Sequence, residues 1–264
     1  MQKVISKDGT IIAFDRSGEG PALIVVSGAL SDRTVAAPVA ALLAPHFTVF
    51  AYDRRGLGAS GDTAPYAVDR EVEDLEALIG EAGGSAFVFG HSSGAVLALT
   101  AAAHGLAITR LALYEPPFIV DDSRPRPPED FAAQLAELIA SGRRGDAVAL
   151  FLTKGVDLPV DAVAQMRSAP MWPALEAMAH TLVYNVIIMG DTMAGNSLPA
   201  KRWASATLPT LVMDGGESPA WARHAVQAVV DALPNAQRRT LAGQTHGAAP
   251  EVLAPVLEEF FTGR

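Results

Sequence analysis

The chain has 264 residues, of which 50% are apolar and 19% are charged, with a formal net charge of −9 and no cysteine. This length holds one large domain, or one domain with an insertion, around a sizeable core. The negative charge argues against nucleic acid or an anionic membrane as a partner. The absence of cysteine excludes disulfides, thiolate metal sites and a cysteine nucleophile, and it fits a reducing compartment, so we expect a cytoplasmic protein.

The sequence has no apolar segment of the kind that enters or crosses a membrane. Residues 1–9 lack the apolar centre of a signal peptide. No run of 18 apolar residues occurs anywhere in the chain. We therefore expect neither an export signal nor a membrane span.

The first half of the chain alternates between predicted strands and predicted helices. It opens with a β-hairpin around the Asp8-Gly9 turn, and the apolar run 22–26 is typical of a strand buried on both faces of a parallel sheet. The predicted strands are 4–5, 11–14, 22–26, 47–52, 86–90 and 110–114, and the predicted helices are 34–43, 68–80 and a segment from Ser92 to about Ala103. This alternation indicates a mostly parallel α/β sheet with helices on both faces.

The alternation stops after Pro117. Residues 121–129 carry three prolines and several charges, which predicts a stiff, exposed linker. Residues 131–203 show helical spacing without a βα unit, and the alternation returns with a predicted strand at 208–213, a helix at 219–232, a strand at 238–241 and a helix at 250–261. We therefore expect a discontinuous core domain, 1–116 and 201–264, and a helical insertion, 117–200, over the carboxyl ends of the strands.

The sequence Gly90-His91-Ser92-Ser93-Gly94 follows a predicted strand directly and precedes a helix of small residues. This is the Gly-x-Ser-x-Gly pattern in which a sharp turn exposes a serine hydroxyl above the edge of a sheet. Glycines two positions before and after the serine allow the strand and the helix to cross closely. We therefore take Ser92 as the candidate nucleophile.

Four segments together resemble the α/β-hydrolase family over nearly the whole chain: Ser27-Gly28-Ala29, residues 53–60, residues 90–94, and Gly243-Gln244-Thr245-His246. The resemblance implies an α/β-hydrolase fold in which the insertion is a cap. It also implies a serine nucleophile, an acid and a histidine in that order along the chain. The segment Asp53-Arg54-Arg55 is better explained as a structural turn of ion pairs than as a phosphate site.

The resemblance assigns the base to His246, in a glycine-containing loop between the last strand and the last helix. The other five histidines lie in or beside helices or, for His91, inside the turn with the side chain expected to point away from the nucleophile's cavity. The oxyanion is expected to be bound by the backbone N–H groups of Ala29 and Ser93. Ser27 stands where the family often has a histidine.

The acid has several candidates. The family usually places it after the strand that ends here near Met213, but the expected position holds Ser218. Asp214 and Glu217 are nearby carboxylates. A second family position follows the strand after the nucleophile helix, as in some haloalkane dehalogenases, and Glu115 occupies it. We take Glu115 as the first choice and leave Asp214 and Glu217 open.

These residues predict a serine hydrolase that cleaves a small, fairly apolar ester or related acyl compound through an acyl-enzyme. A serine at position 92 argues against the dehalogenase and epoxide-hydrolase branches, which use aspartate there. A cofactor-free perhydrolase of haloperoxidase type, a C–C bond hydrolase, a lyase and a non-catalytic ligand-binding relative remain alternatives. We expect no cofactor and no metal, since no His/Asp/Glu cluster has metal-ligand spacing. The expected partner is a small-molecule substrate.

Overall fold

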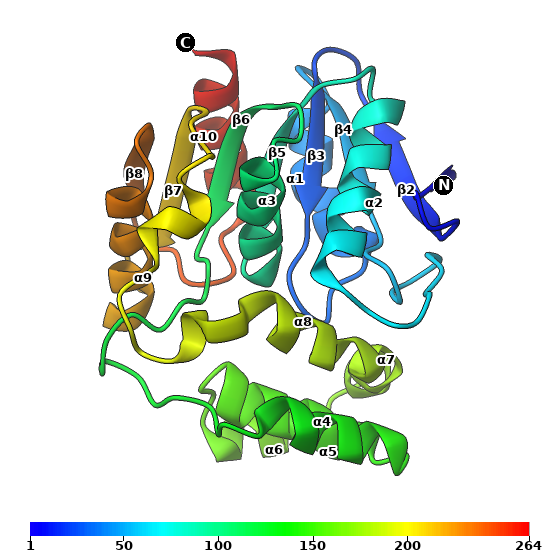
Figure 1. Ribbon diagram of the computed structural model, residues 1–264, viewed down its shortest axis with the longest axis vertical. Helices are drawn as coiled ribbons and strands as arrows, with labels where there is room; N and C mark the ends of the chain where they lie inside the picture. Colours follow the sequence, from blue (N-terminus) through cyan, green and yellow to red (C-terminus); the bar gives the residue numbers. More distant parts are fainter. Residues whose placement is uncertain (264) are drawn as a thin grey trace.

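The computed structural model describes residues 1–263, and its centre is an eight-stranded sheet. The strands lie in the order β1-β2-β4-β3-β5-β6-β7-β8; β1 and β2 pair antiparallel, β2 pairs antiparallel with β4, and all later pairs are parallel (Figure 1). Their bounds are Gln2–Ile5, Ile11–Ser17, Ala22–Val26, Thr48–Tyr52, Ala86–His91, Ile108–Tyr114, Thr210–Gly215 and Ala236–Leu241 for β1, β2, β3, β4, β5, β6, β7 and β8. The predicted α/β-hydrolase fold class is confirmed.

Both faces of the sheet are buried, and successive side chains along each strand contribute alternately to the two faces. In β3, Leu23 and Val25 contact the cluster on one face, while Ile24 and Val26 contact the cluster on the other. Successive strand side chains point to opposite faces, so a strand covered on both sides must be apolar at every position. This explains why 22–26 is a continuous apolar run.

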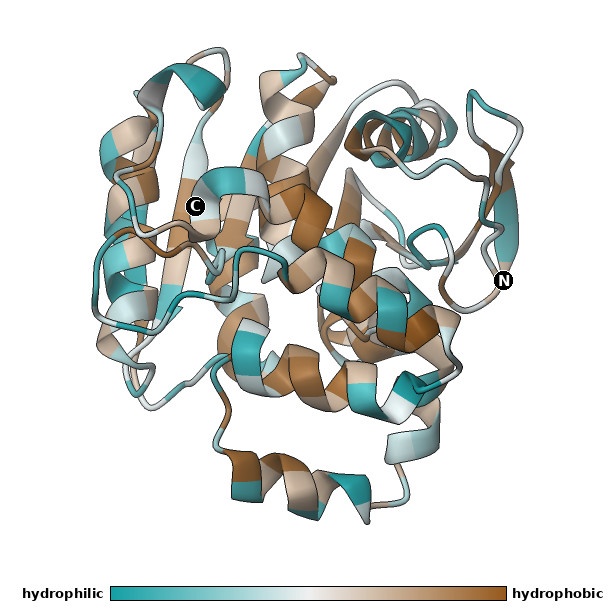
Figure 2. Ribbon diagram, turned by 60° about the horizontal axis from the view of Figure 1, so that its bottom comes forward, coloured by the Kyte–Doolittle hydropathy of each residue, from teal (hydrophilic) through white to brown (hydrophobic). Residues whose placement is uncertain are grey.

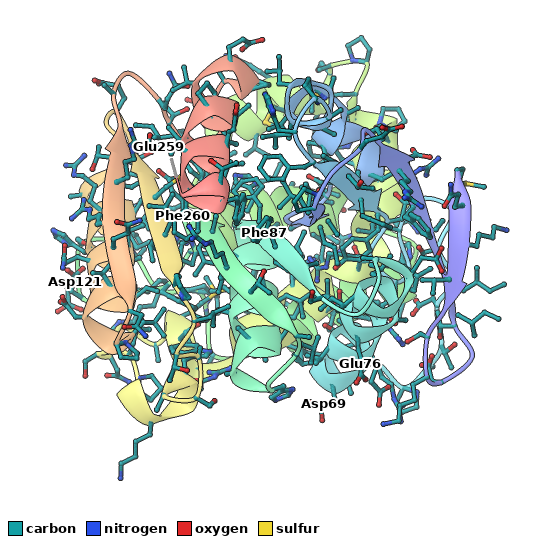
Figure 3. The ribbon with its side chains drawn as sticks, turned by 90° about the horizontal axis from the view of Figure 1, so that it is seen from above. Asp69, Glu76, Phe87, Asp121, Glu259 and Phe260 are labelled. Carbon is teal, nitrogen blue, oxygen red and sulfur yellow. The ribbon has the colours of Figure 1, made fainter. Side chains whose placement is uncertain are left out.

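Five helices cover the two faces of the sheet. Helices α2 (Val68–Glu81), α3 (Ser93–Ala103) and α9 (Ala220–Ala232) pack on one face, and α1 (Ala37–Leu43) and α10 (Pro250–Thr262) pack on the other. Figure 3 shows Phe87 of β5 close to Phe260 of α10 near the middle of the sheet. The rings of Phe87 and Phe261 stack with centroids 5.0 Å apart.

A second layer of helices lies at the carboxyl ends of the parallel strands, beneath the sheet in Figure 1. It has its own apolar cluster, which includes Phe131, Leu135, Val148, Trp172 and Leu182, and Figure 2 shows apolar and hydrophilic positions alternating along its helices. Its elements are α4 (Phe131–Ala140), α5 (Arg144–Leu150), η2 (Phe151–Gly155), α6 (Val160–Arg167), α7 (Trp172–Met178), η3 (Ala179–Thr181), α8 (Leu182–Met189) and η4 (Gly190–Met193). The next element, η5 (Ala200–Trp203), contacts α3, and its Trp203 belongs to the apolar cluster of the sheet.

The observed elements differ from the predicted ones mainly at their ends. The first helical segment opens with a 3₁₀ turn, η1 (Arg33–Ala36), and β6 and β8 begin two residues earlier than predicted. The segment 121–129 is mostly exposed, as predicted, but Arg124 within it is buried and 4% exposed. The prediction of a uniformly exposed linker is therefore wrong at Arg124, because Trp221, far along the chain, packs against its guanidinium. No helix of the described residues is long and apolar enough to cross a membrane.

The turn Asp53-Arg54-Arg55 forms buried ion pairs, as predicted. Arg54 donates two hydrogen bonds to Glu71 of α2, at 2.7 and 2.8 Å, and both side chains are at most 3% exposed. Arg55 pairs in the same way with Asp74 one turn later in α2, at 2.7 and 2.8 Å. These pairs fix the loop after β4 against α2.

Glu71→Ala should lower the free energy of unfolding by about 3–5 kcal/mol, because it leaves the buried Arg54 guanidinium without its carboxylate. Urea unfolding measures this change. The matched control is Glu73→Ala in the same helix, since Glu73 pairs at 2.7 Å with Arg70, whose side chain is 42% exposed. That control should cost only about 0–1 kcal/mol, and equal losses in the two variants would contradict the prediction.

Candidate active site

Ser92 lies between β5 and α3 in a left-handed backbone conformation, with φ 57° and ψ −126°. Its neighbours explain how this strained turn is accommodated. A Cβ on Gly90 would lie 2.7 Å from Ala95 Cα, and a Cβ on Gly94 would collide with the carbonyl oxygen of Val26. Only glycine at both positions lets β3, β5 and α3 approach this closely. The turn therefore has the geometry of a nucleophile elbow.

The loop after β3 passes directly beside the Ser92 hydroxyl. A Cβ on Gly28 would lie 2.9 Å from Ser92 Cβ and 3.5 Å from Ser92 Oγ. Ala29 follows Gly28 in the chain, and Ser93 is the first residue of α3, where backbone N–H groups have no acceptor within the helix. The structure thus places Gly28, the residue before Ala29, against Ser92, while Ser93 follows Ser92 directly in the chain.

Glu115 and His246 meet across the ends of β6 and the last loop. His246 Nδ1 and Glu115 Oε2 are 2.7 Å apart, and the Gly215 N–H donates to Glu115 Oε1 at 2.8 Å. Glu115 itself is 1% exposed and has a φ of 45°. A carboxylate held from both sides in this way can orient an imidazole and stabilise its positive form.

Glu115 keeps its charge although it is buried. Burial opposes ionisation, but hydrogen bonds from His246 and the Gly215 N–H, together with the nearby Ser218 hydroxyl, lower the pKa of Glu115 below its usual value. The Ser218 hydroxyl is buried and has no hydrogen bond of good geometry. The carboxylate is therefore ionised at neutral pH.

The two other candidate acids have different environments. Asp214 is fully buried inside β7, and its oxygens accept hydrogen bonds from Arg238 at 2.9 and 3.1 Å and from Thr240 at 3.0 Å, both in β8. Glu217 is exposed, and its backbone N–H donates to the Gln244 carbonyl at 2.9 Å. Of the three carboxylates, the structure brings Glu115 to His246.

In residues 1–263, the Ser92 hydroxyl and the His246 ring form no hydrogen bond with each other. The His246 side chain is 41% exposed. In an empty site such hydrogen bonds are often long and tighten only when substrate binds. The exposed imidazole edge is available to solvent and to a ligand at the carboxyl ends of β5 and β6.

Two residues that hold the His246 loop were missed by the sequence analysis. His91, expected to point away, has Nε2 2.8 Å from the His246 carbonyl oxygen, with the two rings 4.7 Å apart. The Tyr114 hydroxyl donates to the Thr245 carbonyl at 2.5 Å. His91 and Tyr114 are partners in the register of β5 and β6, and each immediately precedes a candidate triad residue. Their positions directly before Ser92 and Glu115 are the sequence feature from which this role could have been predicted.

His91 acts as a neutral donor to the loop. Burial and the neighbouring His246 lower the pKa of His91 from 6.5 to about 4. Above that pH the ring is uncharged, and its Nε2 carries a proton if it donates to the His246 carbonyl. His91 thus holds the backbone of His246 in place.

A buried polar bridge connects the helical layer to the elbow. Asn185 of α8, 2% exposed, accepts hydrogen bonds at Oδ1 from the Ser93 hydroxyl at 2.8 Å and from Arg54 Nη1 at 3.0 Å. Its amide donates to the Thr181 carbonyl at 2.9 Å. Asn185 therefore lies over the residue that follows the candidate nucleophile.

Two hollows lie near the sheet. One of about 610 Å³, lined by Arg110, Arg238 and Glu259 among others, is at the amino ends of β6 and β7, away from Ser92. A smaller cavity of about 150 Å³ lies behind the elbow, lined by Ser27, His91 and Tyr114 among others. Within residues 1–263 no group of three or more histidines and carboxylates is arranged to hold a metal ion.

Comparisons of the sequence and the fold with known proteins point to one family. The model of the alpha/beta hydrolase family matches residues 23–256. The chain is 61% identical to an alpha/beta hydrolase from Sphaerobacter thermophilus, with a TM-score of 0.93 over 98% of this chain and 100% of that one. An enol-lactonase from Burkholderia xenovorans has a TM-score of 0.72 at 21% identity, over 99% of this chain and 100% of that one, which shows the shared fold.

Among curated proteins, N-formylmaleamate deformylase from Pseudomonas putida is 36% identical over 104 residues. The matched stretch covers 38% of this chain and 39% of that protein.

His91→Gln should flatten the pH dependence of stability. The unfolded chain binds a proton at His91 below about pH 6.5, whereas the folded protein does so only near pH 4, so the wild type loses stability as the pH falls through this window. Glutamine can still donate to the His246 carbonyl but does not titrate. Urea unfolding at pH 7, 5.5 and 4.5 checks this, with the exposed His104→Gln as a control that should keep the wild-type slope. Parallel curves for His91→Gln and wild type would contradict the prediction.

Proposed function

Because the chain belongs to the alpha/beta hydrolase family, we propose that it hydrolyses a small, fairly apolar ester or related acyl compound. In this proposal Ser92 is the nucleophile, His246 the base and Glu115 the acid of a catalytic triad. The single observation that supports it most is the 2.7 Å contact between His246 Nδ1 and the buried Glu115 carboxylate. Its geometry is that of an acid orienting a base.

The proposed reaction has two halves. Ser92 Oγ attacks the acyl carbon while His246 Nε2 takes the hydroxyl proton, and the N–H groups of Ala29 and Ser93 stabilise the oxyanion. The imidazolium gives the proton to the departing alcohol, leaving an acyl-enzyme. Water then attacks the acyl carbon, gives a proton to His246, and the acid product leaves as Ser92 regains its proton. Throughout, Glu115 stabilises the positively charged imidazole.

We further propose that residues 117–200 form the cap over this site. Support comes from their separate apolar cluster and from the contact of Asn185 with Ser93. The core domain in this division is 1–116 and 201–264. A cap of this kind excludes water and shapes the acyl pocket.

The partial resemblance to N-formylmaleamate deformylase favours transfer of an acyl group to water. A perhydrolase activity and C–C bond hydrolysis would use the same side chains and stay as alternatives. A non-catalytic ligand-binding role is disfavoured by the Glu115–His246 pair. The cytoplasmic location expected from the composition stays a prediction.

Ser92→Ala should abolish turnover and leave the fold intact, because the hydroxyl lies at an elbow and not in the core. The expected loss in kcat is on the order of 10³–10⁶. A panel of 4-nitrophenyl esters measures turnover, and a fluorophosphonate probe should label the wild type and not the variant. Ester hydrolysis within a few-fold of wild type in Ser92→Ala would refute the proposal, as would a wild type that neither labels nor turns over.

Glu115→Gln should lower kcat by up to about 10⁴ with little change in melting temperature. The amide presents N–H groups to Nδ1, which holds the imidazole in the wrong tautomer. The matched control is Asp214→Asn, which should instead lower the melting temperature, because it weakens the pairing with Arg238, and keep kcat within a few-fold. The reverse order of activity losses would transfer the acid's role to Asp214, and small losses in both would favour the ligand-binding alternative.

A further inference from the structure

Three arginines of the described residues are almost fully buried: Arg54 (3% exposed), Arg55 (1%) and Arg124 (4%). Arg54 and Arg55 each donate two hydrogen bonds to a buried carboxylate. Arg124, by contrast, forms no ion pair with any carboxylate in residues 1–263. A buried guanidinium is costly to desolvate unless an anion compensates its charge. Arg124 therefore lacks the negative partner that Arg54 and Arg55 have.

The contacts of Arg124 leave two of its nitrogens unsatisfied. Nη2 donates to the Gly155 carbonyl at 2.5 Å, and the guanidinium carbon lies 4.3 Å from the centre of the Trp221 ring. Nε and Nη1 are buried and have no hydrogen-bond acceptor in the described part of the chain. Burial lowers the pKa of Arg124 to about 10, although the charge of the exposed Asp157 opposes this shift, so the side chain is charged at neutral pH.

Arg124 lies at the boundary between the helical layer and the sheet domain. Gly155 belongs to η2 of the helical layer, and Trp221 belongs to the first turn of α9. Asp121, three residues before Arg124, contacts His224 of α9 with 2.6 Å between Oδ2 and Nδ1, and Figure 3 shows Asp121 at this edge of the molecule. The segment that carries Arg124 is therefore tied to α9.

The same boundary adjoins the proposed catalytic residues. β5, β6 and β7 are neighbours in the sheet, and they are followed at their carboxyl ends by Ser92, Glu115 and the segment leading to α9. Adjacent strands lie about 4.8 Å apart, so the end of β7 is about 10 Å from the end of β5. A substrate that reaches from Ser92 past the end of β7 toward α9 therefore spans at least about 10 Å.

We propose that Arg124 binds a carboxylate of the substrate, with the scissile acyl group at Ser92 and the carboxylate between η2 and α9. This inference rests on the proposed hydrolase function and narrows its substrate class to acyl compounds that carry a free carboxylate. A carboxylate gives the unpaired N–H groups a hydrogen-bond acceptor, and it gives the buried positive charge a negative partner. A neutral carbonyl would supply only the first. The atoms Nε and Nη1 are shielded, so η2 and α9 must part slightly to admit the ligand.

A structural role is the competing explanation. Stacking on Trp221 and the bond to Gly155 could make Arg124 a link between the layers. Such a link would affect all substrates equally, whereas a carboxylate site would affect only those that carry the charge. Comparing charged and neutral substrates of equal length therefore separates the two roles.

The experiment compares 4-nitrophenyl monoesters of succinic, glutaric and adipic acids with 4-nitrophenyl esters of the unbranched monocarboxylic acids of the same chain lengths. Arg124→Met keeps the apolar stem and removes the charge, and Arg124→Lys restores a charge. Arg126→Met is the matched control, since Arg126 lies in the same segment, is 50% exposed and pairs with Asp122.

The wild type should prefer at least one carboxylated ester over its neutral match by about 10- to 100-fold in kcat/KM, the range of a charge-assisted hydrogen bond. Arg124→Met should lose that preference, mainly through KM, and Arg124→Lys should recover part of it. Arg126→Met should behave as wild type. A wild type that prefers neutral esters at every length, or equal losses on both series in Arg124→Met, would overturn the inference.

A second measurement avoids dependence on variant folding. Glutarate and adipate should bind the wild type and Ser92→Ala in isothermal titration calorimetry, and neutral glutaramide and adipamide should bind at least 10-fold more weakly. Equal affinities would also overturn the carboxylate site. This assay needs no turnover, so it separates failure of the carboxylate site from failure of the hydrolase function. A protein that binds glutarate but hydrolyses no ester would refute only the hydrolase function.

Discussion

The arrangement around Ser92 depends on how closely three backbone segments approach one another. The ends of β3 and β5 and the start of α3 meet where Gly28, Gly90 and Gly94 leave no room for a side chain. This closeness holds Ser92 at a positive φ and turns its hydroxyl toward the loop after β3. The same contact brings the loop after β3 against the Ser92 side chain, so the strained turn and this close approach have one origin.

The ends of β6 and β7 carry two buried carboxylates with different tasks. Asp214 is occupied by Arg238 and Thr240, which hold the edge strand β8. Glu115 faces His246 and the Gly215 N–H. Both oxygens of Asp214 accept hydrogen bonds from β8, whereas one oxygen of Glu115 faces the imidazole, so the partners of the two acids distinguish them more than their burial does.

Much of the fold could be predicted because its signals are local. Alternating apolar runs and helical spacing identify the strands and helices to within a few residues, and the Gly-x-Ser-x-Gly pattern identifies the turn at Ser92. Contacts between distant segments could not be predicted in this way. Asn185 and Ser93 are 92 residues apart, and nothing near either predicts their bond. Arg124 was misjudged for the same reason, since prolines and charges around it indicate exposure, while its burial depends on Trp221.

The bond between Asn185 and its two donors determines how the helical layer can move. Lifting α8 away from the elbow would leave the Arg54 Nη1 and Ser93 hydroxyl donors without their acceptor, at a cost of about 1–3 kcal/mol for each. The stacked rings of Tyr66 and Tyr184, 4.0 Å apart, add to this attachment. Helix α8 is thus anchored to the elbow, and any opening of the site that lifts this helix must first break these polar contacts.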